Sequence, residues 1–526
     1  MIAGLKNMAK PGFLRHVFTM GGLTAVSRVL GLVREMMQSR LIGAGVEQSA
    51  FTLAFAIPNM ARKLFGEGAL TAAFVPVFKG ELETVGIEKA ARLARAVVTM
   101  MILMVGAMVS IALAVTFFAS FHPPQSADPY RWALTCKLVG ILLPYMLAIC
   151  AAAFGMGVLN ALGHFKAAGF MPAFLNILWI CALAVLCLFP GLSVSNRIVF
   201  VAGAILVGGF SQMVFMFVCM ARAGVSPMPL FSGWGGEKVR LVWRNTAIAA
   251  LGAGAIQVNY ALDQLLGQLA APWAASVIGY AERLMDLPLG VIGVAFGTVL
   301  LPTFAGFFAK NDFEGARGAL LSSIKNLLFL MLPAAAGLFV LAPDVTSAIY
   351  EGGAFDSEAT LRVSRALAVY AIGLGFFGIQ KSFVPWFQSQ NDMKTPLRVT
   401  VWTVLLNASL NIAAVIFLPQ EWRHVGLAAS TTFCAAVGSA ALLAAAYRRN
   451  GSLGLTAIAG DIAKILFAAV MMAFAVNYLK PLIAKVIDNG YISLAIIMTV
   501  GAVVYASLAL LLGVGFRRRQ RAAAKR

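Results

Sequence analysis

The stretch SRVLGLVREMMQSR (Ser27–Arg40) lies in an apolar run of membrane-spanning length, yet it carries Arg28, Arg34, Glu35 and Arg40. The chain around it has 526 residues, of which 60% are hydrophobic and only 12% are charged. Apolar runs long enough to cross a bilayer recur from one end of it to the other. A membrane β-barrel would instead show short strands of alternating polarity, which the sequence lacks. We therefore predict an all-α polytopic membrane protein whose first helix carries charge that needs an explanation.

The apolar runs also predict the number of helices. At roughly 35 to 40 residues for each helix with its loop, the chain has room for about 12 to 14 transmembrane helices. We expect fourteen, at residues 14–42, 48–79, 92–119, 132–161, 167–190, 197–222, 241–270, 274–308, 317–343, 360–389, 396–418, 425–447, 460–480 and 490–515. No stretch between them is long enough for a soluble domain.

Positive charge collects in the loops. The formal net charge is +20, which on a soluble protein would suggest a nucleic-acid partner. In a membrane protein, Lys and Arg gather instead in the cytoplasmic loops. With the N-terminus inside, alternate loops are rich in these residues, and the basic tail RRRQRAAAKR (517–526) falls on the same side. We therefore expect an even number of helices, both termini in the cytoplasm, and no nucleic-acid partner.

Patterns that would indicate metal or nucleotide chemistry are missing from the sequence. The six cysteines occur singly, without a CxxC pair, and the four histidines are isolated. This is not the spacing of a metal site or of a disulfide framework. There is also no GxxxxGK[ST] run that would hold the phosphates of ATP. We expect a membrane transporter with no metal, no cofactor and no catalytic site.

An internal repeat divides the chain. Pro76 and Pro302 occupy similar positions near helix ends, and Lys166 and Lys394 follow similar polar turns. The two pairs have nearly the same separation along the chain. Two nearly equal offsets indicate two six-helix lobes of the same orientation, an arrangement found in transporters. We predict an N-terminal lobe, a Pro- and Gly-rich linker, a C-terminal lobe, and two extra helices with a basic tail, at residues 1–224, 225–238, 239–450 and 451–526.

Charged residues inside the predicted spans indicate a binding site. Each costs roughly 2.5 to 3.5 kcal/mol at the bilayer centre, so such residues face a bundle interior or a water-filled cavity. The cations are Arg28, Arg34, Arg62, Lys63 and Arg283, and the carboxylates are Glu35, Glu67, Glu282 and Asp286. One interpretation is that each cation pairs with a carboxylate and only holds helices together. Because the cations outnumber the carboxylates, we favour a central cationic cavity for an anionic, phosphate-bearing substrate, which guanidinium groups bind in bidentate fashion.

Four motifs carry a resemblance to a known family. They are SRVLGLVRE (Ser27–Glu35), IPNMARKLFGEGALTAAFVP (Ile57–Pro76), YAERLMDLPLGVIGVAFGTVLLP (Tyr280–Pro302) and NDMKTP (Asn391–Pro396). Over essentially its whole length the chain resembles the lipid II flippases of bacterial cell-wall synthesis, the MurJ/MviN family. These belong to the multidrug/oligosaccharidyl-lipid/polysaccharide exporter superfamily. The motif that begins at Ile57 is specific to the family.

The resemblance implies a fold and a set of site residues. The fold is two six-helix lobes around a V-shaped central cavity, with the last two helices forming a groove for a polyprenyl tail. The substrate-binding residues implied are Arg28, Arg34, Arg62 and Arg283. The supporting acidic or cavity residues are Glu35, Glu67, Lys63, Glu282 and Asp286. Ser49 and Ala56 depart from the family, whose members often have Asp and Lys at these positions.

The resemblance also implies a function. It is the movement of lipid II, the undecaprenyl-pyrophosphate-linked disaccharide-pentapeptide, from the inner to the outer leaflet of the cytoplasmic (inner) membrane by alternating access. Membrane lipids and the cell-wall synthesis machinery are the further partners that it suggests.

Three alternatives stay open. A flippase for another polyprenyl-pyrophosphate oligosaccharide would use the same arginines. A cation-coupled drug exporter of the same superfamily would be expected to expose carboxylates and aromatic rings to its substrate. A membrane enzyme that acts on polyprenyl phosphates would need a cluster of carboxylates or histidines.

Overall fold

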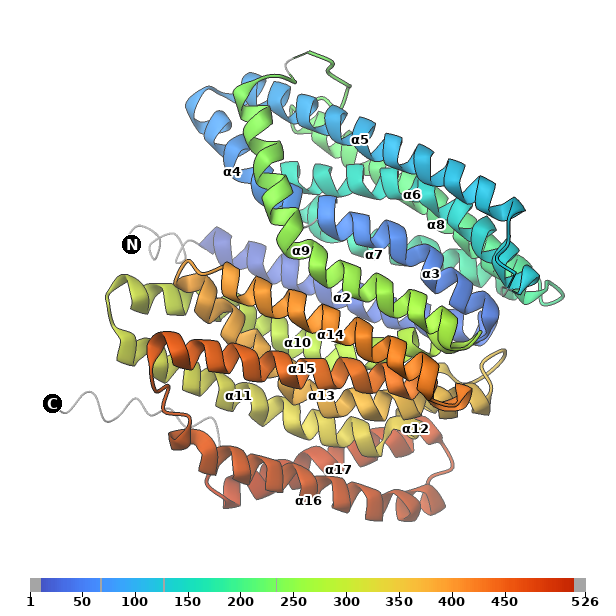
Figure 1. Ribbon diagram of the computed structural model, residues 1–526, viewed down its shortest axis with the longest axis vertical. Coiled ribbons are helices and arrows are strands. Elements are labelled where there is room, and N and C mark those ends of the chain that lie inside the picture. The colour runs from blue at the N-terminus through green and yellow to red at the C-terminus, as the bar shows by residue number, and fades with distance from the viewer. Residues whose placement is uncertain (1–10, 67–68, 126–127, 233, 515–526) are drawn as a thin grey trace. The chain divides into compact units, whose positions relative to one another are not determined.

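The computed structural model describes residues 11–66, 69–125, 128–232 and 234–514 (Figure 1). Every named element in these ranges is a helix, and extended pairing within them is limited to one isolated bridge between Gly352 and Phe355. The predicted all-α fold is therefore confirmed. Glu67 and the basic tail 517–526 lie outside the described residues.

The helices follow the apolar runs closely. In chain order they are α2 Pro11–Ile42, α3 Val46–Ala61, the π-helix η1 Arg62–Gly66, α4 Ala69–Thr84, α5 Ile87–Phe121, α6 Pro129–Ala161, α7 Phe165–Cys187, α8 Val194–Arg222, α9 Glu237–Ala270, α10 Ala274–Ala309, α11 Phe313–Val340, α12 Ala342–Tyr350, α13 Ser357–Ser389, α14 Lys394–Phe417, α15 Gln420–Asn450, α16 Thr456–Val486 and α17 Gly490–Leu511. Each predicted range is occupied by helix, the second of them by α3, η1 and α4 in succession. The prediction misses α12, which has 9 residues.

Ten helices in the described part of the chain are long and apolar enough to cross a membrane. About 20 apolar residues suffice, because a rise of about 1.5 Å per residue then spans the hydrocarbon core. Helices α2 and α10 are also long enough, at 32 and 36 residues, and carry the charged motifs. The predicted total of fourteen membrane spans stays a prediction.

The first of two compact units comprises Met1–Gln268 together with Gly352–Phe355. At its centre α6 packs against α3, α5 and α8, while α2 packs along α7 (Figure 1). Glycine permits one close approach in this unit: a Cβ at Gly209 of α8 would lie 2.3 Å from Cδ2 of Tyr145 on α6. Small residues at such contacts let membrane helices pack closely. A larger residue at this position would push α6 and α8 apart.

The second unit comprises Leu269–Glu351 and Asp356–Arg526. Its central helix is α13, which packs against α10, α11 and α15. The last two helices, α16 and α17, pair with each other, and α16 lies along α11 (Figure 1). The Tyr505 hydroxyl of α17 donates to the Phe329 carbonyl oxygen of α11 at 2.7 Å. The two extra helices are therefore attached to the second unit largely through α11. The lobe boundaries drawn from the sequence repeat stay a prediction.

Two ion pairs fasten α16 to the second unit. Lys325 of α11 pairs with Asp461 near the start of α16 at 2.7 Å. Lys480 near the end of α16 pairs with Asp344 of α12 at 2.6 Å. These four side chains are between 25% and 34% exposed. Because they are partly shielded from water, each pair attracts more strongly than one on an open surface.

The backbone repeats at two pairs of turns. Gly163, after α6, has φ = 84°, and Asn391, after α13, has φ = 58°. In each of these turns the next amide donates to the carbonyl oxygen five residues back, at 2.8 and 3.0 Å. Gly224, after α8, and Gly451, after α15, also have positive φ, and both pairs have nearly the same separation as the lysine pair of the sequence repeat. Glycine and asparagine tolerate this left-handed conformation, so corresponding helices in the two halves end in the same way.

The motif NDMKTP has a structural role at the start of α14. The Asp392 carboxylate accepts from the Thr395 backbone N–H at 2.9 Å and from the Thr395 hydroxyl at 2.7 Å. Arg449 at the end of α15 forms an ion pair with the same carboxylate. Burial raises the pKa of Asp392, but the hydrogen bonds from Thr395 and the charge of Arg449 outweigh it and hold that pKa below its usual value. The motif thus caps α14 and ties the α13–α14 turn to α15.

A four-residue strap, Gly352–Phe355, belongs by its contacts to the first unit although both of its flanking segments belong to the second. The Ala354 N–H donates to the Arg40 carbonyl oxygen, near the end of α2, at 2.8 Å. Gly353 has φ = 60°, and a Cβ there would lie 2.2 Å from the same carbonyl oxygen. A Cβ at Gly43 would lie 2.4 Å from the Ala354 carbonyl oxygen. Both positions therefore need glycine.

We predict that Gly353→Ala lowers the thermal stability of the protein more than Gly163→Ala does. Both glycines have positive φ, a strain of about 1–2 kcal/mol for alanine. Nothing lies within 4 Å of a Cβ at Gly163, whereas a Cβ at Gly353 would meet the carbonyl oxygen of Arg40. Thermal unfolding of the purified variants in detergent measures the difference. Equal losses in Tm would show that the strap's contact with α2 contributes nothing beyond backbone strain.

Candidate functional site

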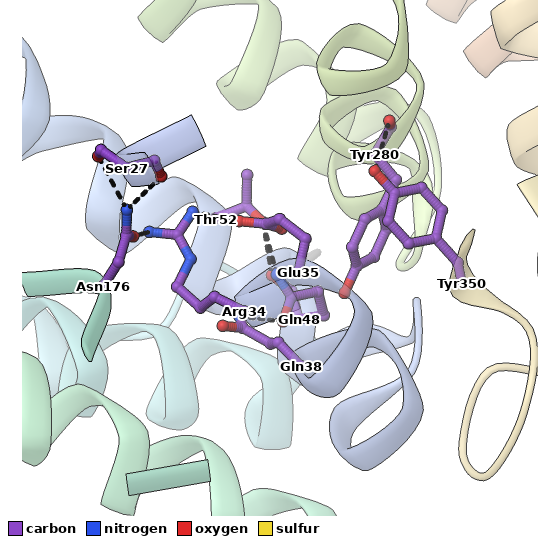
Figure 2. Close-up of polar contacts among 9 residues, drawn as sticks. All are labelled: Ser27, Arg34, Glu35, Gln38, Gln48, Thr52, Asn176, Tyr280 and Tyr350. Carbon is purple, nitrogen blue, oxygen red and sulfur yellow. Dashed lines mark hydrogen bonds and ion pairs between the residues drawn. The ribbon is translucent and has the colours of Figure 1, made fainter. Parts of the chain in front are cut away.

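Arg34, in the second half of α2, contacts Asn176, Glu35 and Trp179, and Figure 2 draws the first two of these. Its Nη1 donates to Oδ1 of Asn176 on α7 at 2.9 Å, and its Nη2 forms an ion pair with Glu35. Its guanidinium carbon lies 4.3 Å from the ring centroid of Trp179, also on α7. The Arg34 side chain is 17% exposed and that of Glu35 is 8% exposed. The guanidinium is thus held in one direction at a largely buried position.

Helix periodicity explains why these residues meet. Asn176 and Trp179 are three residues apart, so they lie on the same face of α7, and α7 packs along α2. Nδ2 of Asn176 donates to the carbonyl oxygen of Ser27 at 3.0 Å. Ser27 and Arg34 are two helical turns apart and face α7 together. A Cβ at Gly31 between them would lie 3.7 Å from Asn176 Nδ2, an ordinary contact, so this approach does not require glycine.

A second buried polar group lies one turn further along α2. Nε2 of Gln38 donates to Oε1 of Gln48 on α3 at 3.0 Å, and Nε2 of Gln48 donates to the Thr52 hydroxyl oxygen at 3.5 Å (Figure 2). Gln38 and Gln48 are 2% and 3% exposed. Amide side chains hold membrane helices together by such bonds. The group ties α2 to α3 beside the arginine.

Arg62 and Lys63 open the π-helix η1. Pro58, four residues before Arg62, lies within α3 and has no N–H to donate. Nε and Nη2 of Arg62 both donate to Oδ1 of Asn59, at 3.2 and 2.9 Å. Nζ of Lys63 lies 5.4 Å from the ring centroid of Tyr260 on α9, within cation–π range. Short π-helices are rare and often occur at functional sites, and this one was not predicted from the sequence.

In the second unit, α10 carries the other predicted site residues. Oε1 of Glu282 accepts from the Tyr370 hydroxyl of α13 at 3.4 Å. Glu282 and Arg283 are partly buried, whereas Asp286 is exposed. The guanidinium and the two carboxylates on α10 therefore differ in their exposure.

The structure places the predicted site residues as follows. Arg34 and Glu35, which are adjacent in the sequence, form an ion pair, and their roles in substrate binding stay a prediction. Arg28 also lies on α2, with its side chain exposed. Glu67 falls outside the described residues. The convergence of Arg283 with the arginines of the first unit stays a prediction.

The neutral residues that orient the arginines were not predicted from the sequence. Asn176 is an amide inside an apolar helix, and Trp179 follows it three residues later. Asn59 lies within the IPN motif, one turn before its partner Arg62. Polar residues in membrane helices usually hydrogen-bond to another helix or serve a function. That rule identifies Asn176 as a candidate site residue, whereas its partner Arg34 cannot be predicted from the sequence.

These contacts suit the binding of an oxyanion. Asn176 and Asn59 are neutral, so they direct the guanidinium groups of Arg34 and Arg62 without cancelling their charge. A guanidinium can bind two phosphate oxygens at once. Within the described ranges, no group of three or more His, Cys, Asp or Glu residues is placed to hold a metal ion. The guanidinium groups of Arg34 and Arg62 have the chemistry to bind a phosphate group through charge and hydrogen bonds.

Comparison with known proteins gives consistent matches. The family model described as "Lipid II flippase MurJ" matches residues 38–503. A protein from Rhizobium tropici named probable lipid II flippase MurJ is 31% identical over 523 residues, which cover 96% of each chain. A protein from Burkholderia cenocepacia named lipid II flippase MurJ is 30% identical over 447 residues, which cover 83% of this chain and 84% of the relative.

Solved structures share the fold. One described as "Lipid II flippase MurJ, inward closed conformation" has a TM-score of 0.76 at 24% identity, and the match covers 94% of this chain and 98% of that one. An inward-facing MATE family multidrug resistance transporter of the MOP superfamily has a TM-score of 0.68 at 16% identity, with 81% and 96% covered. At these identities the likeness establishes the fold alone.

The family model spans three of the four motifs from which the resemblance was predicted, those that begin at Ile57, Tyr280 and Asn391. The resemblance is therefore confirmed, and the many apolar helices make the protein a multi-pass membrane protein. On a family match over most of its length and on relatives of about the same length, this chain belongs to the lipid II flippase MurJ family.

Proposed function

We propose that this protein moves lipid II from the inner to the outer leaflet of the cytoplasmic membrane by alternating access. The observation that carries the proposal is the family match, which extends over residues 38–503 and includes relatives named lipid II flippases. The chemistry of the site supports it, because lipid II carries a pyrophosphate between its sugar and its lipid tail. Arginines directed by neutral groups are suited to such a dianionic linkage.

In this proposal Arg34, Arg62 and Arg283 bind the pyrophosphate, and Arg28 assists. Arg34 is largely buried and held in one orientation, and Arg62 is partly buried and hydrogen-bonded to Asn59. A guanidinium already in place loses less conformational freedom when it meets a phosphate. The central cavity between two six-helix lobes, in which these residues would meet, is part of the proposal.

The supporting residues of the proposal balance this charge. Glu35 pairs with Arg34, and Glu67 is the second carboxylate that holds the arginines in place. These carboxylates keep the arginines in place and pair with them more fully once the substrate has left. The remaining supporting residues line the cavity. They are Lys63, Glu282 and Asp286.

The setting of the protein is also proposed. The excess of Lys and Arg in alternate loops supports an inner-membrane location with both termini in the cytoplasm. It also accounts for the net charge of +20 without a nucleic-acid partner. Membrane lipids surround the helices, and the cell-wall synthesis machinery would receive the flipped substrate. The protein acts as a transporter rather than as an enzyme.

A drug exporter is the second candidate, because a MATE transporter shares the fold. The site argues against a cationic drug as the substrate. Arg28, Arg34, Arg62 and Lys63 bring four positive charges to α2 and η1 against one carboxylate, Glu35, and the excess would repel a cation. A flippase for another polyprenyl-pyrophosphate oligosaccharide is chemically closer, since arginines that bind pyrophosphate do not contact the sugar.

Depletion of the protein in its own cell separates these candidates. We expect undecaprenyl-pyrophosphate-linked disaccharide-pentapeptide to accumulate on the cytoplasmic leaflet, where lipid extraction and leaflet-specific labelling would detect it. Re-expression of the intact chain is the control and should clear the accumulated lipid. Accumulation of a different lipid-linked oligosaccharide, or of none, would contradict the assignment to lipid II.

We predict that Arg34→Ala lowers lipid II flipping by about 10- to 100-fold while abundance stays near normal. The estimate follows from hydrogen bonds to charged groups, which contribute about 1.5–3 kcal/mol. Flipping in proteoliposomes, together with quantitative immunoblotting of the membrane fraction, measures both quantities. Arg92→Ala is the matched control, because Arg92 lies exposed on α5 and its loss should leave flipping unchanged. Normal flipping by the Arg34 variant would exclude this residue from the site.

We predict that Arg34→Lys also loses most of its flipping activity. A lysine ammonium is a compact point charge and cannot bond in the planar, forked geometry that Asn176 and Glu35 impose on the guanidinium. The same proteoliposome assay, with Arg92→Lys beside it, measures the effect. Retention of wild-type flipping by Arg34→Lys would show that positive charge alone is sufficient at this position.

A further inference from the structure

The Asn176 amide on α7 can have only one orientation. The Arg34 guanidinium can only donate, so the atom 2.9 Å from its Nη1 must be the acceptor Oδ1. Nδ2 then faces Ser27, where it donates to the backbone carbonyl oxygen at 3.0 Å and lies 3.3 Å from the hydroxyl oxygen. A backbone carbonyl can only accept, so both ends of the amide require the same orientation (Figure 2). With Asn176 only 8% exposed, the amide is a buried bridge from the α2 backbone to Arg34.

The Trp179 ring supports the guanidinium from a second side. The ring is itself held by Phe51 and Phe55 of α3, with centroids at 5.9 and 5.6 Å and T-shaped geometry. Trp179 is 2% exposed, and its Nε1 makes no hydrogen bond within the described part of the chain. A buried N–H without an acceptor is unfavourable, and a phenylalanine would avoid this cost. What the indole provides here is its ring face, and tryptophan is the best aromatic partner for a cation.

These contacts fix the direction of a positive charge and leave the charge in place. An arginine side chain has many rotamers, and this conformational entropy is lost when the side chain is ordered. Asn176 and Trp179 order Arg34 before any ligand arrives, so a phosphate that binds it incurs less of this loss. Asn176 and Trp179 are both neutral. In this they differ from Glu35, whose carboxylate lowers the net charge of the group when it pairs with Arg34.

We propose that Asn176 and Trp179 are positioning residues of this transporter, which hold the Arg34 guanidinium in the orientation that receives the substrate pyrophosphate. They act through Arg34 and need not touch the substrate. The inference rests on the proposed function, because it assigns these residues a role in pyrophosphate binding. It assigns α7, which carried none of the predicted site residues, a direct part in the site.

The test is the affinity of the purified full-length protein for a short-chain, detergent-soluble lipid II, measured by microscale thermophoresis. We expect Asn176→Ala to weaken binding by about 5- to 30-fold, the effect of losing the one hydrogen bond from Arg34. Asn176→Asp keeps the shape of the side chain but adds a carboxylate that neutralises Arg34, so it should weaken binding at least as much. Gln212→Leu is the control, because Gln212 is a buried amide of α8 that bonds to a backbone carbonyl oxygen and not to an arginine.

The tryptophan gives a second, independent series. We expect Trp179→Phe to weaken binding by about 2- to 5-fold and Trp179→Leu by about 5- to 30-fold, in the order of their cation–π strength. Trp243→Phe on α9 is the matched control. Its Nε1 is also buried without a hydrogen bond in the described structure, and none of the described cation–π contacts involves its ring. Trp179→Phe removes an N–H that has no acceptor, so this variant is expected to fold.

A double-mutant cycle separates positioning from general damage. If Asn176 and Trp179 act through Arg34, their substitutions should have no further effect on binding in an Arg34→Ala background. Equal losses in both backgrounds, or unchanged binding in the single variants, would overturn the positioning role while leaving the proposed function intact. Unchanged binding in Arg34→Ala alone would overturn the role of Arg34 in the proposed function, and the positioning role with it.

Discussion

A positive charge inside a bundle of membrane helices must be held by its neighbours, because the bilayer cannot solvate it. In this protein that constraint decides how α2 and α7 pack. Arg34 needs an acceptor and a polarisable surface, and α7 supplies both on one face, three residues apart. The Asn176 amide also donates to the backbone carbonyl oxygen of Ser27 on α2. The pairing of these two helices therefore depends on polar contacts as well as on apolar surface.

Asparagine recurs as the partner of arginine in this molecule. Arg34 donates to Asn176 across two helices, and Arg62 donates to Asn59 one turn earlier in its own segment. A carboxylate in either place would hold the guanidinium more tightly but would also neutralise it, as Glu35 already does in part for Arg34. An amide oxygen orients the donor without removing any of its charge.

Sequence reasoning was strongest where the bilayer restricts the backbone. An apolar run of about 20 residues in a membrane has almost no alternative to a helix, and the predicted range 132–161 differs from α6 by three residues at one end. It was weakest where contacts join distant parts of the chain. The bond between Ala354 and Arg40 joins the end of α2 to a segment in the second half of the chain, and no local pattern indicates it. The π-helix at Arg62 and the partners of Arg34 depend likewise on how helices pack.

The two ion pairs on α16 have a consequence for the surrounding lipid. Asp461 and Lys480 take part in one pair each, and they are separated by about five helical turns. That separation is about 28 Å along a helix, close to the thickness of the hydrocarbon core. Helix α16 is thus tied to α11 near its start and to α12 near its end, so a tilt of α16 relative to these two helices would stretch one of the two pairs. A bilayer whose hydrocarbon core departs from this thickness would therefore tilt α11, α12 and α16 together rather than α16 alone.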